Sequence, residues 1–285
     1  MKPYSILDSR DFYMSNNNIT NQLTSNYLQI VQEINVKIED STNKAKATFD
    51  IFIKKEMFKK YDIEVNRTNF LINEIEIENK FSSVSNHYFS CLFPIQFKIN
   101  EENKLVVTNF DDIDSRIKLK DLFFSESMDG EGLKHIRDQF FEQTSTNEKI
   151  QFLISSLGII KIIELSLQRY EQNPAIDIIW SVPIIGNTYW ETQIKKNIQN
   201  NSITFISENT NKKIVLENLQ KYCQEQELNS VFGYQESEIF ATFETTINYL
   251  PNLVTIEDSQ TQINIKIGNL FEYQEITTLV STMDQ

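Results

Sequence analysis

The sequence is poor in the residues on which most catalytic and metal sites depend. It has two histidines, two cysteines and six glycines among 285 residues. It lacks the nucleophile elbow G-x-S-x-G, the phosphate-binding motifs G-x-x-x-x-G-K-[ST] and G-x-G-x-x-G, and the zinc motif H-E-x-x-H. These absences disfavour serine hydrolases, P-loop NTPases, Rossmann dehydrogenases and zinc proteases. We therefore expect no cofactor, no metal ion and no assignable catalytic residue.

The few histidines and cysteines do not form a recognisable site. Cys91 and Cys223 lie too far apart in the sequence for a CxxC redox motif, so we expect reduced, buried thiols. His87 precedes Cys91 by four residues, but SNHYFSCLF is typical of a strand or loop, where such positions are about 13 Å apart. His135 and Asp138 are three residues apart on an expected helix, and we interpret them as a solvated face.

Long hydrophobic runs are also missing. The nearest, 150–167, is interrupted by Gln151, Lys161 and Glu164, which predicts a buried helix and no membrane span. The first residues, MKPYSILDSRDFYMSNNN, have no apolar segment typical of a secretory signal. The sequence thus predicts a cytoplasmic protein, or an envelope or periplasmic one if an N-terminal segment has been removed.

Charge of one sign dominates. The chain has 27 Lys plus Arg against 40 Asp plus Glu, a formal net charge of −13. Such a charge repels a phosphate backbone and an anionic membrane surface, so we expect no nucleic-acid partner. It favours solubility and suits a basic protein partner.

What the sequence has in abundance is period-two alternation at both ends. Ile30, Ile34 and Ile38 lie on one side of an expected strand, and a polar turn at 100–103 joins two others. The runs are too close together for parallel crossovers, so 27–110 predicts an antiparallel meander. After Pro174 the pattern returns in 175–180, 202–209, 212–219, 237–250 and 261–283, with a second expected hairpin turn at 209–211.

The middle of the chain changes to helical spacing. Leu133, Ile136 and Phe140 lie three and four residues apart. One long helix is expected over 144–172, capped within 144–147 and ended by Asn173-Pro174, and its apolar residues surround it almost completely. We predict an α+β fold, with antiparallel meanders in two halves, 1–114 and 174–285, packed around a central helical segment, 115–173, in one compact unit.

Clusters of acidic residues are candidates for calcium or catalytic sites. Asp111, Asp112 and Asp114 lack the spacing of a calcium-binding loop, and a helix N-terminus explains them without an ion. A glycan hydrolase that uses two carboxylates stays open, since such acids need no fixed spacing in sequence.

The segment WSVPIIGNTYW, 180–190, contains both tryptophans. Trp180, Tyr189 and Trp190 are the candidate ligand-binding residues, because aromatic side chains line many pockets for apolar or sugar ligands. We favour a core corner instead, in which Pro183 and Gly186 flank a turn and the tryptophans lie on strands at either side.

Two short patterns resemble a family of uncharacterised β-rich bacterial proteins that are often lipid-anchored. Their residues are Leu105, Val107, Phe110, Ile113, Pro183, Gly186 and Trp190. This chain departs from the family in having no lipobox cysteine near its start and Asn103 in place of a usual glycine. The resemblance implies a non-enzymatic envelope or binding role.

The sequence as a whole favours a non-enzymatic binding or protein-interaction module. The alternatives are a carrier of a small apolar ligand and the two-carboxylate glycan hydrolase.

Overall fold

Eleven strands pair into one antiparallel sheet in the computed structural model, which describes residues 25–55, 61–73, 80–125, 130–167, 175–197, 200–208, 210–225, 234–250 and 255–282. The strands are β1 (Asn26–Ile38), β2 (Ser41–Lys55), β3 (Ile63–Ile72), β4 (Ile95–Ile99), β5 (Leu105–Val107), β6 (Ala175–Val182), β7 (Gly186–Asn197), β8 (Ser202–Ser207), β9 (Ile239–Tyr249), β10 (Ile256–Ile267) and β11 (Phe271–Ser281). The helices are α2 (Lys80–Ser90), α3 (Phe110–Ser125), α4 (Glu131–Gln143), α5 (Asn147–Ser155), α6 (Gly158–Leu167) and α7 (Lys212–Glu225), with a 3₁₀ turn, η3 (Glu236–Glu238).

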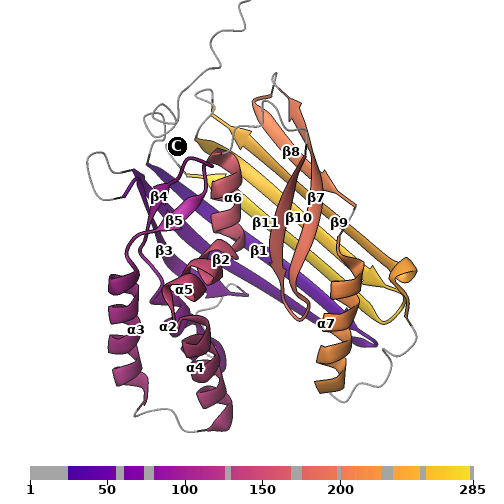
Figure 1. The fold of residues 1–285 in the computed structure, drawn as a ribbon, viewed down its shortest axis with the longest axis horizontal. Coiled ribbons are helices and arrows are strands. Elements are labelled where there is room, and N and C mark those ends of the chain that lie inside the picture. The colour runs from indigo at the N-terminus through magenta and orange to yellow at the C-terminus, as the bar shows by residue number, and fades with distance from the viewer. Residues whose placement is uncertain are drawn as a thin grey trace, which may run out of the picture.

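The strand order is β5-β4-β3-β2-β1-β11-β10-β9-β8-β7-β6, so each half of the chain contributes one side of the sheet. The two sides meet in the middle, where β1 pairs with β11 from Leu28 opposite Ser281 to Ile38 opposite Phe271. Figure 1 shows the helices on one side of this sheet, with α7 apart from the others.

Alternation along the strands decides which side chains face the helices. In β11 every second residue from Phe271 to Leu279 is buried, and the residues between them are exposed or half-buried. Strands β9 and β10 show the same alternation because successive side chains of a strand point to opposite faces. We call the buried face the inner face and the other the outer face.

The sheet curls until its β6 edge crosses the inner face. Trp180 of β6 donates a hydrogen bond from Nε1 to Oε2 of Glu275 on β11, 3.3 Å away, although four strands separate them in the strand order. The rings of Trp180 and Trp190 both pack against Phe243 of β9, at 5.7 and 5.5 Å between centroids. Accordingly, β7 and β8 lie in front of β10 and β11 in Figure 1.

An ion pair joins three helices over the β1–β5 side. Nε and Nη2 of Arg137 on α4 donate to the two carboxylate oxygens of Asp121 on α3, at 2.6 and 2.7 Å. The hydroxyl of Tyr88 on α2 donates to the same carboxylate at 2.8 Å. The hydrogen bond from Arg137 lowers the pKa of Asp121 from its usual value.

The expected single helix over 144–172 is wrong. Two helices, α5 and α6, occupy this region and are bent by 80° relative to each other. Ser156 caps the end of α5, and Gly158 begins α6 against the indole of Trp180. The expected N-cap is confirmed at Thr146, whose side chain accepts from the Lys149 amide, whereas Asn173-Pro174 lies outside the described residues.

In the described chain, none of the helices has by itself the length and apolar character of a membrane span. Only α5 and α6 taken together meet those criteria, across their 80° bend.

Two further segments expected as strand or loop are helices. Residues 212–219 belong to α7, where Val215, Leu219 and Cys223 form a buried stripe at four-residue spacing. The β-branched residues Ile214 and Val215 are typical of strands, and for this reason the segment was predicted as a strand. The SNHYFSCLF segment lies largely in α2. Because α7 begins at Lys212, β8 is followed by a helix and not by the second strand of the hairpin expected at 209–211. Residue 209 itself lies outside the described residues.

The α+β class with an antiparallel sheet is confirmed. The finer prediction, two β halves around a central helical segment, is not confirmed. The halves instead join through β1 and β11, and helices occur within both, as α2 and α7. The boundaries at 114 and 173 stay predictions.

Gly158→Ala tests how closely α6 packs on the curled edge. A Cβ at Gly158 would lie 2.7 Å from Cζ2 of Trp180, so the indole or the helix must shift. We expect a loss of about 1–3 kcal/mol in the free energy of unfolding, measured by urea denaturation.

The matched control is Gly132→Ala at an exposed position of α4, where alanine is expected to stabilise the helix by about 0.5–1 kcal/mol. Equal effects of the two substitutions would contradict the close packing of α6 on Trp180.

Candidate functional site

A buried carboxylate lies at the centre of the inner face. Glu275 is 1% exposed, and both its oxygens accept hydrogen bonds. Oε1 accepts from Gln32 Nε2 at 2.9 Å and from Thr277 Oγ1 at 3.1 Å. Oε2 accepts from the Tyr273 hydroxyl at 2.6 Å and from Trp180 Nε1 at 3.3 Å. Four neutral donors thus satisfy this carboxylate, and none of the described residues places a cation beside it.

Strand register brings these donors together. Tyr273 and Thr277 flank Glu275 on the same face of β11, and Gln32 of β1 lies opposite Thr277. Burial, followed by the charge and hydrogen bond of Glu275, raises the pKa of Tyr273 far above its ordinary value. The Tyr273 hydroxyl therefore keeps its proton at neutral pH and remains a hydrogen-bond donor.

A band of polar side chains continues from this cluster across the inner face. Thr277, Thr261 and Thr245 lie opposite one another on β11, β10 and β9, and the hydroxyls of Thr245 and Thr261 are 3.0 Å apart. Ser259, on the same face of β10, has a buried Oγ without a hydrogen-bond partner in the described part of the chain. We call Gln32, Thr277, Thr261 and Thr245 the polar row.

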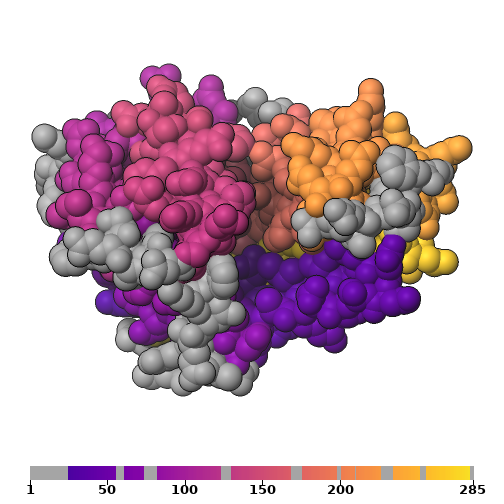
Figure 2. All heavy atoms as spheres, turned by 90° about the horizontal axis from the view of Figure 1, so that it is seen from below, coloured from indigo at the N-terminus to yellow at the C-terminus, as the bar shows by residue number. Residues whose placement is uncertain are grey.

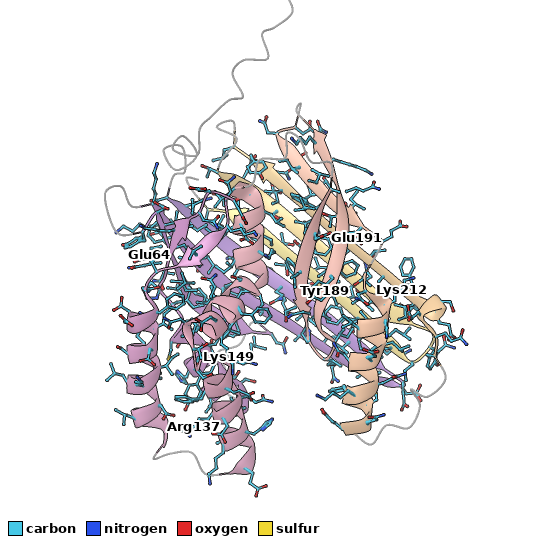
Figure 3. The ribbon with its side chains drawn as sticks, viewed as in Figure 1. Glu64, Arg137, Lys149, Tyr189, Glu191 and Lys212 are labelled. Carbon is cyan, nitrogen blue, oxygen red and sulfur yellow. The ribbon has the colours of Figure 1, made fainter. Side chains whose placement is uncertain are left out.

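The three aromatic candidates do not form one site. Trp180 and Trp190 are 2% and 0% exposed on the inner face, whereas Tyr189 is 46% exposed on the outer face. Figure 3 shows Tyr189 and Glu191 on β7, on the side where α7 begins at Lys212. The expected turn is confirmed at Gly186, whose φ of 82° favours glycine.

Both tryptophans have hydrogen-bond partners in the core. Trp190 Nε1 donates to Thr188 Oγ1 at 2.8 Å, and the Thr188 hydroxyl donates to the carbonyl of Trp180 at 2.9 Å. Trp180 alone of the three candidates reaches the Glu275 cluster, a contact that the sequence analysis did not predict, and its role in ligand binding stays a prediction.

The described contacts of the histidines and cysteines do not form a catalytic or metal site. Cys91 Sγ donates to the carbonyl of His87 at 3.4 Å, and Cys91 and Cys223 are free and buried. Burial raises the pKa of both thiols. No group of three or more potential metal ligands occurs within the ranges that the structure describes. His135 is exposed on α4.

The acidic candidates also have ordinary positions. Asp111 and Asp112 lie in the first turn of α3, as expected for acids near a helix N-terminus. The hydrogen-bond partners of Glu275 among the described residues are neutral donors, and none of them is a carboxylate.

A hollow opens over the inner face of the β1–β2 hairpin. Figure 2 shows it between the α4–α5 side and the α7 side of the molecule, with β1 and β2 as its floor. Inner-face side chains of β1 and β2 are more exposed toward this hollow. Ile30 is fully buried, Ile34 and Ala47 are half-buried, and Ala45 is exposed. Its floor is therefore apolar and partly solvent-accessible.

Two shallow pockets are also present among the described residues. One, of about 330 Å³, lies by the β1–β2 and β10–β11 turns and includes Tyr234 and Gly268. The other, of about 290 Å³, lies over the outer-face residues Glu33, Asn35 and Lys46 of the β1–β2 hairpin, and Ile34 and Ala45 also contribute to its lining. Charged and amide side chains dominate both linings, unlike the hollow.

No family model and no curated protein matches the chain. One solved structure, of lipid–protein interactions in lipovitellin, is similar at 7% sequence identity with a TM-score of 0.46. The similarity covers 90% of this chain and 25% of the lipovitellin chain, so this chain spans about a quarter of that protein's length. Such a likeness carries no functional argument, and the resemblance to lipid-anchored bacterial proteins stays a prediction.

Sequence reasoning missed Glu275, although its signal was present. In FEYQEITTLVS the alternation assigns Phe271, Tyr273, Glu275, Thr277 and Leu279 to one face. An acidic residue on an otherwise buried face is unusual, because burying a charge needs dedicated partners.

Glu275→Leu tests whether the four donors depend on this carboxylate. The substitution leaves the buried Tyr273 hydroxyl and Trp180 Nε1 without their acceptor, at a cost of about 1–3 kcal/mol for each donor. We expect a loss of about 3 kcal/mol or more in the free energy of unfolding, measured in guanidinium chloride.

The control is Glu272→Leu, on the exposed face of the same strand, for which we expect a change within about 0.5 kcal/mol. Similar small changes for both variants would show that the Glu275 cluster contributes little.

Proposed function

We propose that the protein binds a small apolar or amphiphilic molecule in the hollow above the β1–β2 hairpin, without catalysing a reaction on it. The observation that carries this proposal is the hollow above β1 and β2 in Figure 2, together with the partial exposure of the apolar residues Ile34, Ala45 and Ala47 on the inner face of these two strands. Concave, mainly apolar surfaces with few polar groups are the usual form of small-molecule sites.

The arrangement of the helices supports this use of the hollow. On one side α4 and α5 pack with each other and with α2 and β5, and on the other α7 packs on β7 and η3. The hollow lies between these two groups (Figure 2). A ligand here would cover apolar surface that the helices leave accessible, which is favourable by about 25 cal/mol per Å².

The polar row gives the hollow a hydrogen-bonding end. Gln32 is half-buried on the inner face of β1, next along the face from Ile34. Its Nε2 is oriented by Glu275, and its Oε1 has no partner in the described part of the chain. One oriented amide beside an apolar floor can fix the direction of a ligand that carries a polar group.

The charge of −13 also supports a basic protein partner, which stays a proposal of its own. The observations favour the small molecule, because charge alone gives no surface for a protein partner, whereas the hollow gives a place for a ligand. No observation favours the glycan hydrolase.

Titration with Nile red, a neutral apolar dye, tests the proposed function. We expect saturable fluorescence enhancement. Ala45→Trp, which places an indole over the inner face, should weaken binding roughly tenfold, equivalent to about 1.4 kcal/mol.

Thr42→Trp is the matched control, since Thr42 is exposed on the outer face of the same strand opposite Lys37. It should leave the dissociation constant unchanged. Binding that does not saturate, or equal affinity of Ala45→Trp and the wild type with unchanged stability, would contradict a ligand site in the hollow.

A further inference from the structure

Arg67 is a cation on the inner face that has no counter-ion among the described residues. It lies on β3 opposite Ile51 of β2, on the same face as the buried Val65. Its Nη2 donates to Oδ1 of Asn86 on α2 at 2.7 Å. Across the ranges that the structure describes, no carboxylate pairs with the guanidinium and its other N–H groups have no acceptor.

Three aromatic rings surround this guanidinium. Its Cζ lies 4.7 Å from the ring centre of Phe70, 5.0 Å from that of Phe89 and 5.3 Å from that of Phe93. Aromatic faces attract a cation but do not replace an anion that accepts its N–H groups. Burial lowers the pKa of Arg67 to about 10, so the side chain still carries its charge at neutral pH.

A β-bulge in β3 positions Phe70, one of the three rings around the guanidinium. Between the pairs Thr48–Leu71 and Asp50–Thr68, the single residue Phe49 faces two residues of β3, Asn69 and Phe70. Asn69 has a φ of 53°, and its side chain donates to Asp50 at 2.7 Å. The extra residue turns Phe70 to the face of Arg67, as bulges do where a side chain must be redirected.

Apolar residues occupy the inner face between Arg67 and the hollow. Phe70 packs on Phe49 with 5.9 Å between ring centres, and Ile72 lies opposite Ala47, which belongs to the floor of the hollow. Arg67 pairs with Ile51, four residues along β2 from Ala47, or about 13 Å at ~3.3 Å per residue. Phe49 and Ile51 on this stretch are 9% and 0% exposed, so a hydrocarbon chain that spans the distance must displace the side chains that cover them.

We propose that Arg67 binds the anionic head group of an amphiphile whose hydrocarbon tail lies in the hollow. This inference rests on the proposed function and specifies its ligand as a carboxylate or phosphate ester with an apolar chain. The free N–H groups of a guanidinium match the paired oxygens of either anion. The three phenylalanines exclude water around the ion pair, which strengthens it.

Binding of oleate, oleyl phosphate and oleyl alcohol, each measured by displacement of Nile red, tests the head-group site. All three share one tail and differ in head group. We expect the wild type to bind at least one of the anions roughly 10-fold to 100-fold more tightly than the alcohol. The preferred anion identifies the head group as a carboxylate or a phosphate. Arg67→Met should bind the anions and the alcohol equally, and Arg67→Lys should recover part of the preference.

The outcomes separate this inference from the proposed function. Equal affinity of the wild type for all three ligands would overturn the head-group site while the hollow kept its role. Failure of all three ligands to displace bound dye would overturn the head-group site, and failure of the dye itself to bind would overturn the proposed function. Loss of affinity for all three in Arg67→Met would assign Arg67 a structural role.

Stability gives a second measurement. An arginine retained for a ligand is not needed for folding, so Arg67→Met should keep or raise the melting temperature of the ligand-free protein. Lys98→Gln, at an exposed position of β4, removes one positive charge elsewhere and should leave the anion preference unchanged. A lower melting temperature in Arg67→Met with an intact anion preference would contradict the proposal.

Discussion

The contact between Trp180 and Glu275 is the one on which the rest of the structure depends. It connects strands that are separated by four others in the sheet, and thereby holds the curl. The same indole packs against Phe243 of β9 and against Gly158, the first residue of α6. One side chain thus positions the sheet edge, the start of a helix and a buried carboxylate.

Curling gives the inner face two different regions. Near Trp180 it is closed, with Glu275 and the threonines of the polar row hydrogen-bonded within the sheet. Toward the β1–β2 hairpin the cover ends, and apolar side chains become accessible under the hollow. Gln32 belongs to both regions, since it donates to Glu275 and lies beside Ile34. A ligand in the hollow would therefore meet a floor whose polar group is already oriented.

Strand alternation made most of the sheet predictable, because residues such as Ile263, Ile265 and Ile267 repeat at the period of a strand. The helices were harder. Local apolar patterns in 212–219 fit both periods, and the break before Gly158 depends on contact with Trp180 from a distant strand. Contacts between residues far apart in sequence leave little trace in local spacing.

The candidate sites show the same limit. Glu275 could have been found from its place on a buried face, but its partner Trp180 could not, since the curl brings them together. Arg67 gave no signal at all, because its enclosure requires the bulge at Asn69 and the placement of α2 over β3. Trp180 was selected as an aromatic residue and is important instead as a hydrogen-bond donor.

A double-mutant cycle with Trp180→Phe and Glu275→Leu tests the central contact most directly. Each single variant removes one side of the hydrogen bond, and the free energies of unfolding of the four proteins give the coupling between the two side chains. A contact that holds the curl predicts a coupling of about 1–2 kcal/mol. Additive effects, with a coupling within about 0.3 kcal/mol of zero, would contradict it.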